Sequence, residues 1–197
     1  MEDKDKLAAA FAAIDEANAQ DPRQTEADGA QQPYELVYGR RMSTRLASFA
    51  PAAPPALQLA ARAQHLERWA IPRADYPMDR VGYLTWRKDQ QARHARRAGE
   101  ILAPLGFSSE TIDRVRFLLR KKQLKRDADT QTLEDVICLV FLQDYAAEFA
   151  AQHPEEKIIS ILRKTWAKMS ERARETALGL PLDPGVRALT EKALADG

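Results

Sequence analysis

Apolar side chains recur along this chain with the period of an α-helix, and this periodicity restricts its fold more than any other feature. The first such segment has apolar residues at positions i, i+3, i+4 and i+7, namely Leu7, Ala10, Phe11 and Ile14. That spacing places them on one face of a helix. No segment alternates apolar and polar residues as a half-buried strand does, and there is no internal repeat. The pattern predicts an all-α protein.

Prolines, glycines and capping residues divide the helical pattern into segments. A polar stretch over residues 20–32, with Pro22 and Gly29, is expected to be a loop. The next expected helix opens at Pro33, and two more span Leu57–Trp69 and Gly82–Ala103. A further helix follows a cap at Ser108 or Ser109, and another runs from Thr130 or Thr132 to Phe149. The last three are expected to open at His153–Pro154, Ser170 and Asp183–Pro184. We expect one single-domain helical bundle of about eight helices over residues 1–197, with its loosest loop at 18–32.

The phase of these helices predicts which side chains form the core. The residues expected to be buried are Leu57, Leu59, Ala60, Ala63, Ile101, Leu102, Val115, Leu118, Ile137, Val140, Phe141, Ile158, Ile161 and Leu162. A chain of 197 residues with 45% hydrophobic side chains is long enough to bury such a core. This composition excludes a wholly disordered chain and a disulfide-stapled miniprotein.

Charge and cysteine content indicate the cellular compartment and leave the function open. The net charge of +1 gives no global field that would attract nucleic acid or an acidic membrane. Cys138 is the single cysteine, so no internal disulfide can form, which fits the reducing cytoplasm. No apolar run approaches the roughly 20 residues that a membrane span needs. We therefore expect a cytoplasmic protein that does not enter a membrane.

Two basic clusters stand out against this balanced composition. Residues 112–126 hold seven basic side chains against Asp113, and residues 87–97 hold five against Asp89. Such clusters are typical of a solvated helix face, and they also suit a surface that contacts phosphate. The sequence leaves both interpretations open.

Histidines and acids offer one possible metal site. His65 lies in the segment expected as a helix over 57–69, and His94 lies in the middle of the next helix, whereas His153 precedes Pro154 where a cap is ordinary. Helical bundles build metal sites from side chains on facing helices. The carboxylate candidates are Glu134 and Asp135, although the pattern Thr132-x-x-Asp135 also fits a capping box. Glycine-rich phosphate loops, CxxC pairs, HExxH and GxSxG motifs are absent from the sequence.

Six segments together point to a known family. They are Tyr38-Gly-Arg-Arg-Met42, Ala60 to Trp69 (AARAQHLERW), Ile71 to Pro77 (IPRADYP), Leu118 to Lys122 (LLRKK), Thr132 to Val136 (TLEDV) and Ile161 to Ser170 (ILRKTWAKMS). Through these segments the chain resembles domain-of-unknown-function family 4202 of bacteria and fungi over nearly all of Ile14 to Leu194.

A more distant resemblance is to the HD-domain metal phosphohydrolases. The segment Leu59 to His65 is similar to the apolar helix that ends in their His-Asp pair, and His94 to Leu102 is similar to their His-x-x-x-Gly-x-Glu-Ile-Leu segment. Tyr38 stands where their early histidine would be, and Leu66 replaces the aspartate of the pair. The resemblance implies that His65, His94 and a late carboxylate hold a divalent metal ion. This carboxylate is Asp135, with Glu134 or Asp144 as the alternative.

This resemblance implies a metal-dependent phosphohydrolase acting on a nucleotide or another phosphoester. A metal-bound water would attack the phosphate, and cationic side chains would neutralise the developing charge. The expected catalytic residues are Glu67, Arg68 and Lys121, and the expected substrate-binding residues are Arg97 and Lys122.

Two other functions remain open at this stage. One is a non-catalytic HD-like module that binds a phosphorylated ligand or RNA through the basic face from Arg114 to Arg126. The other is a helical protein that serves only protein interactions. The sequence does not specify the oligomeric state.

Overall fold

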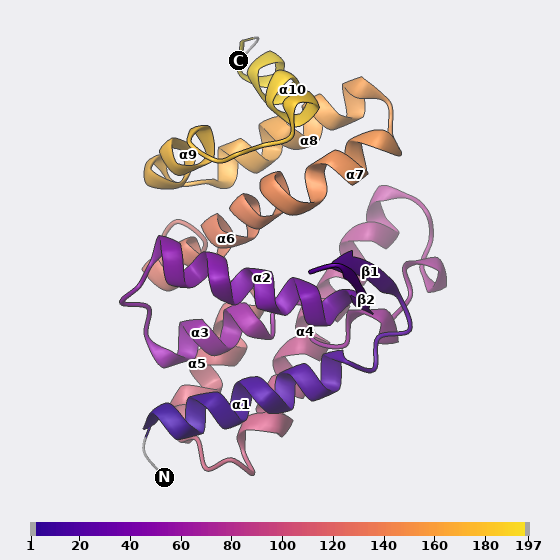
Figure 1. Ribbon diagram of the computed structural model, residues 1–197. Helices are drawn as coiled ribbons and strands as arrows, with labels where there is room; N and C mark the ends of the chain where they lie inside the picture. The colour runs from indigo at the N-terminus through magenta and orange to yellow at the C-terminus, as the bar shows by residue number, and fades with distance from the viewer. Residues whose placement is uncertain (1–2, 196–197) are drawn as a thin grey trace. The chain divides into compact units, whose positions relative to one another are not determined.

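The computed structural model describes residues 3–195 and is mostly helical (Figure 1), with ten α-helices and one β-hairpin in that part of the chain. Contacts divide the chain into two compact units. Unit 1 ends at Gln123, and unit 2 begins at Leu124. The single domain over residues 1–197 stays a prediction.

Unit 1 contains the hairpin and five α-helices. Their bounds are α1 Asp3–Asn18, β1 Gln24–Ala27, β2 Ala30–Pro33, α2 Tyr34–Phe49, α3 Pro55–Arg62, α4 Arg80–Leu102 and α5 Ser109–Leu119, with 3₁₀ turns at η1 Arg68–Ala70 and η2 Arg73–Asp75. The short helix α3 contacts α1, α2 and α5 (Figure 1), so it lies at the centre of the core. Its apolar side chains Leu57 and Leu59 are 1% and 0% exposed.

Unit 2 contains the remaining helices. They are α6 Ala128–Val140, a π-helical segment η3 Phe141–Tyr145, α7 Ala146–Ala151, α8 Glu155–Lys168, α9 Glu171–Leu178 and α10 Pro184–Ala195. Helix α8 packs against α6 and α10, and α6 also contacts α9. Ser170 caps α9 by accepting a hydrogen bond from the backbone N–H of Ala173, as the sequence predicts.

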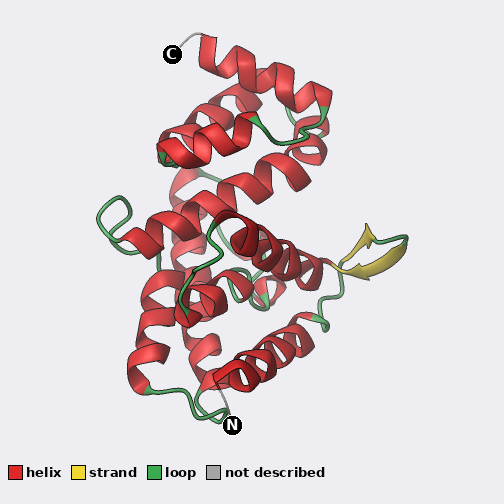
Figure 2. Cartoon of the chain, turned by 60° about the vertical axis from the view of Figure 1, so that its left-hand side comes forward, coloured by secondary structure: helices red, strands yellow, loops and turns green. Residues whose placement is uncertain are grey.

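Residues 20–32 are not the loop that the polar composition suggests. They contain most of an antiparallel hairpin in which Thr25 pairs with Gln32 (Figure 2). Asp28 and Gly29 turn the chain with φ of 53° and 75°, and Asp-Gly is a preferred pair for a two-residue hairpin turn. The all-α prediction is therefore corrected to a mostly helical fold. The side chains of the hairpin are exposed or only half-buried. Its strands therefore lack the alternation of apolar and polar residues that predicts a strand with one buried face.

The expected helix over 57–69 ends earlier, at Arg62. Glu67 adopts the left-handed conformation with φ of 50°, and its backbone N–H donates to Oδ1 of Asn18 at 2.9 Å. This bond holds the chain in a turn after α3. As a result His65 lies in a turn rather than on a helix.

The capping box expected at Thr132 is also wrong. Helix α6 begins at Ala128, and Asp127 caps it by accepting a hydrogen bond from the N–H of Thr130 at 2.9 Å. Thr132 lies inside the helix, where its hydroxyl donates to the carbonyl of Ala128.

The predicted core is mostly confirmed, since ten of its fourteen residues are buried. The half-buried exceptions are Ile101, Ile137, Phe141 and Ile161.

Among residues 3–195, no helix combines the length and the apolar character that crossing a bilayer requires. The longest, α4, has 23 residues, but it carries many arginines.

The position of the cap can be tested by mutation. We expect Asp127→Ala to lower the free energy of unfolding by about 1 kcal/mol, because it removes the side chain that caps α6. Thr132→Ala should change it by less than about 0.5 kcal/mol, since it removes a hydroxyl from within the helix. Urea unfolding followed by circular dichroism measures both. A larger loss for Thr132→Ala than for Asp127→Ala would place the start of the helix at Thr132.

Candidate functional site

Unit 1 buries a group of polar side chains that a stable core does not need. We call Glu35, Tyr38, His65, Arg68 and His94 the histidine cluster. Glu35 is 1% exposed and His94 is 2% exposed. Removing charged groups from water costs several kcal/mol per ion unless partners compensate for it. Such clusters are therefore typical of functional sites.

His65 is held on two sides. Its Nδ1 atom lies 3.2 Å from Oε2 of Glu35, and its ring stacks on that of Tyr38 with centroids 4.0 Å apart and planes 10° apart. Glu35 is in turn held by Arg23, whose Nη2 atom donates to Oε1 at 2.7 Å. When Nδ1 of His65 carries the proton and donates it to Glu35, the lone pair is on Nε2. The His65 side chain keeps 21% exposure, so solvent can reach it.

His94 is fixed from the opposite side by a backbone carbonyl. Its Nδ1 atom lies 2.8 Å from the carbonyl oxygen of Leu66. A carbonyl can only accept, so Nδ1 carries the proton and Nε2 of the neutral ring carries the lone pair. That Nε2 atom is buried and has no hydrogen-bond partner among the described residues. The rings of His65 and His94 have centroids 6.3 Å apart.

Gln90 lies one turn before His94 on α4 and fixes the neighbouring chain. Its Nε2 atom donates to the carbonyl oxygens of Arg68 and Ile71 at 2.7 and 3.0 Å. The guanidinium of Arg68 lies over the ring of Trp86, 4.5 Å from its centroid. These contacts hold the segment that carries Arg68 against α4.

The electrostatics keep both imidazoles neutral at physiological pH. Burial, followed by the charges of Arg68 and Lys121, holds the pKa of His65 well below its ordinary value of 6.5. Burial and the neighbouring His65 lower the pKa of His94 to about 3. Burial raises the pKa of Glu35, and the ion pair with Arg23 opposes that rise. A neutral imidazole can accept a proton or bind a metal, which a protonated one cannot do.

Two of the predicted site residues pair with each other. The carboxylate of Glu67 accepts hydrogen bonds from Arg93 at 2.7 Å and from Arg97 at 3.1 Å. Arg97 also contacts Glu100 at 3.3 Å. Both oxygens of Glu67 are therefore engaged, which makes it a poor general base. Of the other three predicted cations, Arg68 belongs to the histidine cluster, the charge of Lys121 lowers the pKa of His65, and Lys122 lies in the wall of a pocket between α4 and α5.

Asp135 has a structural role within unit 2. Its Oδ1 accepts from the N–H of Ser170 at 2.8 Å and from Gln131 at 2.9 Å, and its Oδ2 accepts from the Ser170 hydroxyl at 2.6 Å. These bonds hold the start of α9. Glu134 lies 3.5 Å from the ammonium of Lys168.

The histidines come together without the third ligand that the sequence suggests. Across residues 3–195, no three His, Cys, Asp or Glu side chains are grouped so that they could hold a metal ion. The structure places His65 and His94 in one cluster, and it places Asp135 in the cap of α9. A divalent metal ion at this cluster stays a prediction.

Sequence reasoning missed Glu35, the carboxylate that contacts His65. An acid in the first turn of a helix ordinarily complements the helix dipole, and Glu35 directly follows the start of α2 at Tyr34. Only the tertiary fold brings it to a histidine thirty residues further along the chain. Tyr38 supplies the ring that stacks on His65.

Comparison with known proteins gives one match. Residues 8–190 match the family described as Domain of unknown function (DUF4202). The chain belongs to the DUF4202 family. No curated protein matches the chain, and no solved structure matches it. The resemblance to HD-domain phosphohydrolases therefore rests on the two sequence segments alone, while the DUF4202 match covers parts of both units.

The buried histidines predict a pH dependence of stability. The unfolded chain protonates its histidines near pH 6.5, whereas folded His94 does so only near pH 3. Between these values the unfolded state binds the extra proton, so stability falls as the pH falls, by about 1.4 kcal/mol per pH unit for one imidazole. Urea unfolding at pH 4, 5, 6 and 7 measures this slope. In His94→Gln the slope should decrease by that amount, and equal slopes in the two proteins would contradict a neutral buried His94.

Proposed function

We propose that this DUF4202 protein is a phosphohydrolase acting on a nucleotide or another phosphoester, with the histidine cluster as its reaction centre. One observation carries the proposal. Two neutral imidazoles lie side by side in a largely buried site, and Nδ1 of each contacts an oxygen, that of the Glu35 carboxylate for His65 and that of the Leu66 carbonyl for His94. Histidines arranged in this way serve as general bases or as metal ligands.

The surrounding residues support proton transfer at His65. Glu35 orients the ring through Nδ1, and Nε2 is the atom that would accept a proton from an attacking water. The water oxygen then bonds to phosphorus, the ester P–O bond breaks, and the leaving oxygen takes up the proton that His65 releases, which restores the neutral imidazole. Arg68 and Lys121 both act on His65 electrostatically, and their positive charges would stabilise the negative charge on the phosphoryl oxygens.

A divalent metal ion is the alternative use of the same atoms, with His65 and His94 as its imidazole ligands. Nε2 of His65 would then bind the ion in place of accepting a proton. The fixed Nδ1 atoms suit this role, because metal-bound histidines usually donate the other ring N–H to a carboxylate or carbonyl. Such an ion, when bound, supplies a water of lowered pKa. Catalytic zinc sites use three protein ligands, and a third is not grouped with these histidines in the described chain.

Hydrolysis of bis(p-nitrophenyl) phosphate and p-nitrophenyl phosphate tests the proposal. The assays are run with EDTA and with added Mg²⁺, Mn²⁺ or Zn²⁺. We expect His65→Ala to lower the rate at least about 100-fold, the usual contribution of a general base. Glu35→Gln should lower it less, because the amide oxygen of glutamine can still accept from Nδ1. The control His153→Ala removes a histidine of unit 2 and should leave the rate per folded molecule unchanged.

Three outcomes would contradict parts of this proposal. If the wild-type protein hydrolyses neither ester under any metal condition, the phosphohydrolase proposal fails. If His65→Ala retains the wild-type rate, the reaction centre lies elsewhere. Activity that survives EDTA would remove the metal ion from the proposal, and elemental analysis of protein purified without a metal-affinity tag measures metal content directly.

A second candidate function is a non-catalytic module that binds a phosphorylated ligand. The observation that favours it is the pocket between α4 and α5, whose wall contains five cationic side chains against two carboxylates. RNA bound through the basic face from Arg114 to Arg126 is another form of this candidate. Salt-dependent binding of a single-stranded RNA oligonucleotide, measured by fluorescence anisotropy, distinguishes it.

A further inference from the structure

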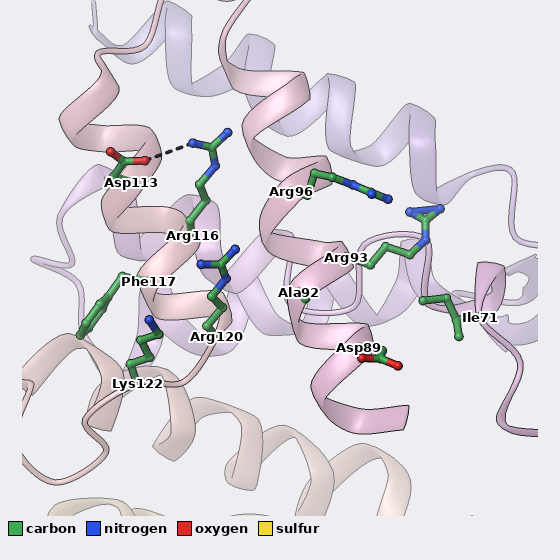
Figure 3. A pocket seen from close by; sticks show the side chains of 10 residues that line it. All are labelled: Ile71, Asp89, Ala92, Arg93, Arg96, Asp113, Arg116, Phe117, Arg120 and Lys122. Carbon is green, nitrogen blue, oxygen red and sulfur yellow. Dashed lines mark hydrogen bonds and ion pairs between the residues drawn. The ribbon is translucent and has the colours of Figure 1, made fainter. Parts of the chain in front are cut away.

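The two basic clusters of the sequence meet at one pocket of unit 1 (Figure 3). This pocket has a volume of about 760 Å³ and lies between α4 and α5. Its lining residues are Ile71, Asp89, Ala92, Arg93, Arg96, Asp113, Arg116, Phe117, Arg120 and Lys122. We propose that this pocket is a second ligand site, which binds the oligophosphate group of a nucleoside diphosphate or triphosphate. This site goes beyond the proposed hydrolysis and does not depend on it.

Gly99 of α4 leaves space for the guanidinium of Arg116, which forms part of the pocket wall. A Cβ atom at this position of α4 would lie 2.4 Å from Nη2 and 2.6 Å from Nε of Arg116. Arg116 therefore lies directly against the helix, at a place where any larger residue would displace it. Glycine within a helix is destabilising relative to alanine. Its presence in α4 is explained by the position that it allows Arg116 to take.

Two of the cations in the pocket wall lack protein partners. The side chains of Arg120 and Lys122 make no hydrogen bond or ion pair with any described residue. Arg120 extends from the end of α5 toward α4, alongside Arg116 (Figure 3). Two unpaired cations near a third guanidinium repel one another, and an anion between them would relieve this repulsion.

The remaining charges in the wall are already paired. Arg93 contacts Glu67 at 2.7 Å, and Arg96 contacts Glu100 at 3.6 Å. Of the two acids, Asp113 lies 3.1 Å from Arg116, and Asp89 accepts a hydrogen bond from the Tyr76 hydroxyl at 2.8 Å. The unpaired charge is therefore concentrated at Arg120 and Lys122, beside Arg116.

The pocket is separate from the histidine cluster. Gln90 and His94 are buried on the inner face of α4, with 1% and 2% exposure. The pocket residues Asp89, Arg93 and Arg96 occupy other faces of the same helix, since successive residues are about 100° apart. Five side chains of the two basic clusters line this pocket.

Size and charge indicate an oligophosphate rather than a single phosphate. Pockets for small molecules usually measure roughly 300–1,000 Å³, and this one falls within that range. The two unpaired cations, Arg120 and Lys122, and the neighbouring Arg116 offer three cationic groups to an anion, which suits a diphosphate or triphosphate chain better than one phosphate. Phe117 and Ile71 add apolar surface where an organic group can pack. The two carboxylates in the wall disfavour a continuous RNA backbone.

Isothermal titration calorimetry with tripolyphosphate, ADP, AMP and orthophosphate tests the site at low salt without added metal. Tripolyphosphate and ADP should bind more tightly than AMP and orthophosphate. The double variant Arg120→Ala/Lys122→Ala should bind tripolyphosphate at least about tenfold more weakly, because it removes both unpaired cations. The control Lys88→Ala removes one charge from α4 outside the pocket and should change the affinity less than about twofold.

Gly99→Ala provides the sharper test. The added methyl group displaces Arg116, so the affinity for tripolyphosphate should fall by roughly tenfold, while the higher helix propensity of alanine keeps the protein at least as stable in urea. If Gly99 has only a structural role, Gly99→Ala should lower the stability in urea and leave the affinity of the folded protein for tripolyphosphate unchanged. Wild-type affinity in both Gly99→Ala and the double variant would overturn the proposal.

Two further measurements separate this site from the reaction centre. His65→Ala should retain wild-type affinity for tripolyphosphate even when it no longer hydrolyses phosphoesters. A loss of affinity in His65→Ala equal to that of the double variant would show that the pocket is not a separate site. An RNA oligonucleotide is also titrated into the protein. If it binds more tightly than tripolyphosphate, and the double variant loses this binding, the ligand of the pocket is RNA and not a nucleotide.

Discussion

The burial of one carboxylate, Glu35, organises unit 1. Its side chain accepts from Arg23 and contacts His65, while its backbone N–H donates to Asp21 at 3.1 Å. Asp21 also binds the guanidinium of Arg23 at 2.8 Å. This network ties the start of the hairpin to the first turn of α2 and to the turn after α3. Because a buried charge without partners costs several kcal/mol, these segments must be in place together for the site to exist.

Asn18 extends the same network to the end of α1. Its Nδ2 atom donates to the carbonyl of Glu35 at 3.4 Å, and its Oδ1 atom accepts from the N–H of Glu67 at 2.9 Å. One buried amide therefore links α1, α2 and the turn that carries His65. Helix α4 completes the arrangement, with His94 on its inner face, Arg96 in the wall of the pocket and Gly99 against the guanidinium of Arg116. The same helix thus separates the two proposed sites.

The helices were predictable from sequence because their signals are local. The period of apolar residues, Pro33 before α2 and Ser108 at the cap of α5 lie within a few residues of the structure that they specify. The histidine cluster depends on contacts between distant residues. Nothing near His65 indicates that its partner is Glu35, and Glu67 reaches its left-handed conformation through a bond to Asn18, 49 positions away. The expectation that His65 and His94 lie together comes from a resemblance between sequence segments, because helical periodicity carries no information about contacts between distant residues.

The turn of the hairpin is a suitable place to attach a label to this protein. Gly29 has no other atom within 4 Å of the place where a side chain would begin, so the tip at Asp28 and Gly29 has room around it (Figure 2). Exposed turns of this kind tolerate inserted sequence better than any other part of a fold. The strands leading from this tip run to Arg23 and Tyr34, on either side of the Glu35 network. A fluorophore or short tag placed there would sit outside the buried network and still be joined to it by rigid backbone, so its signal could report when that network opens.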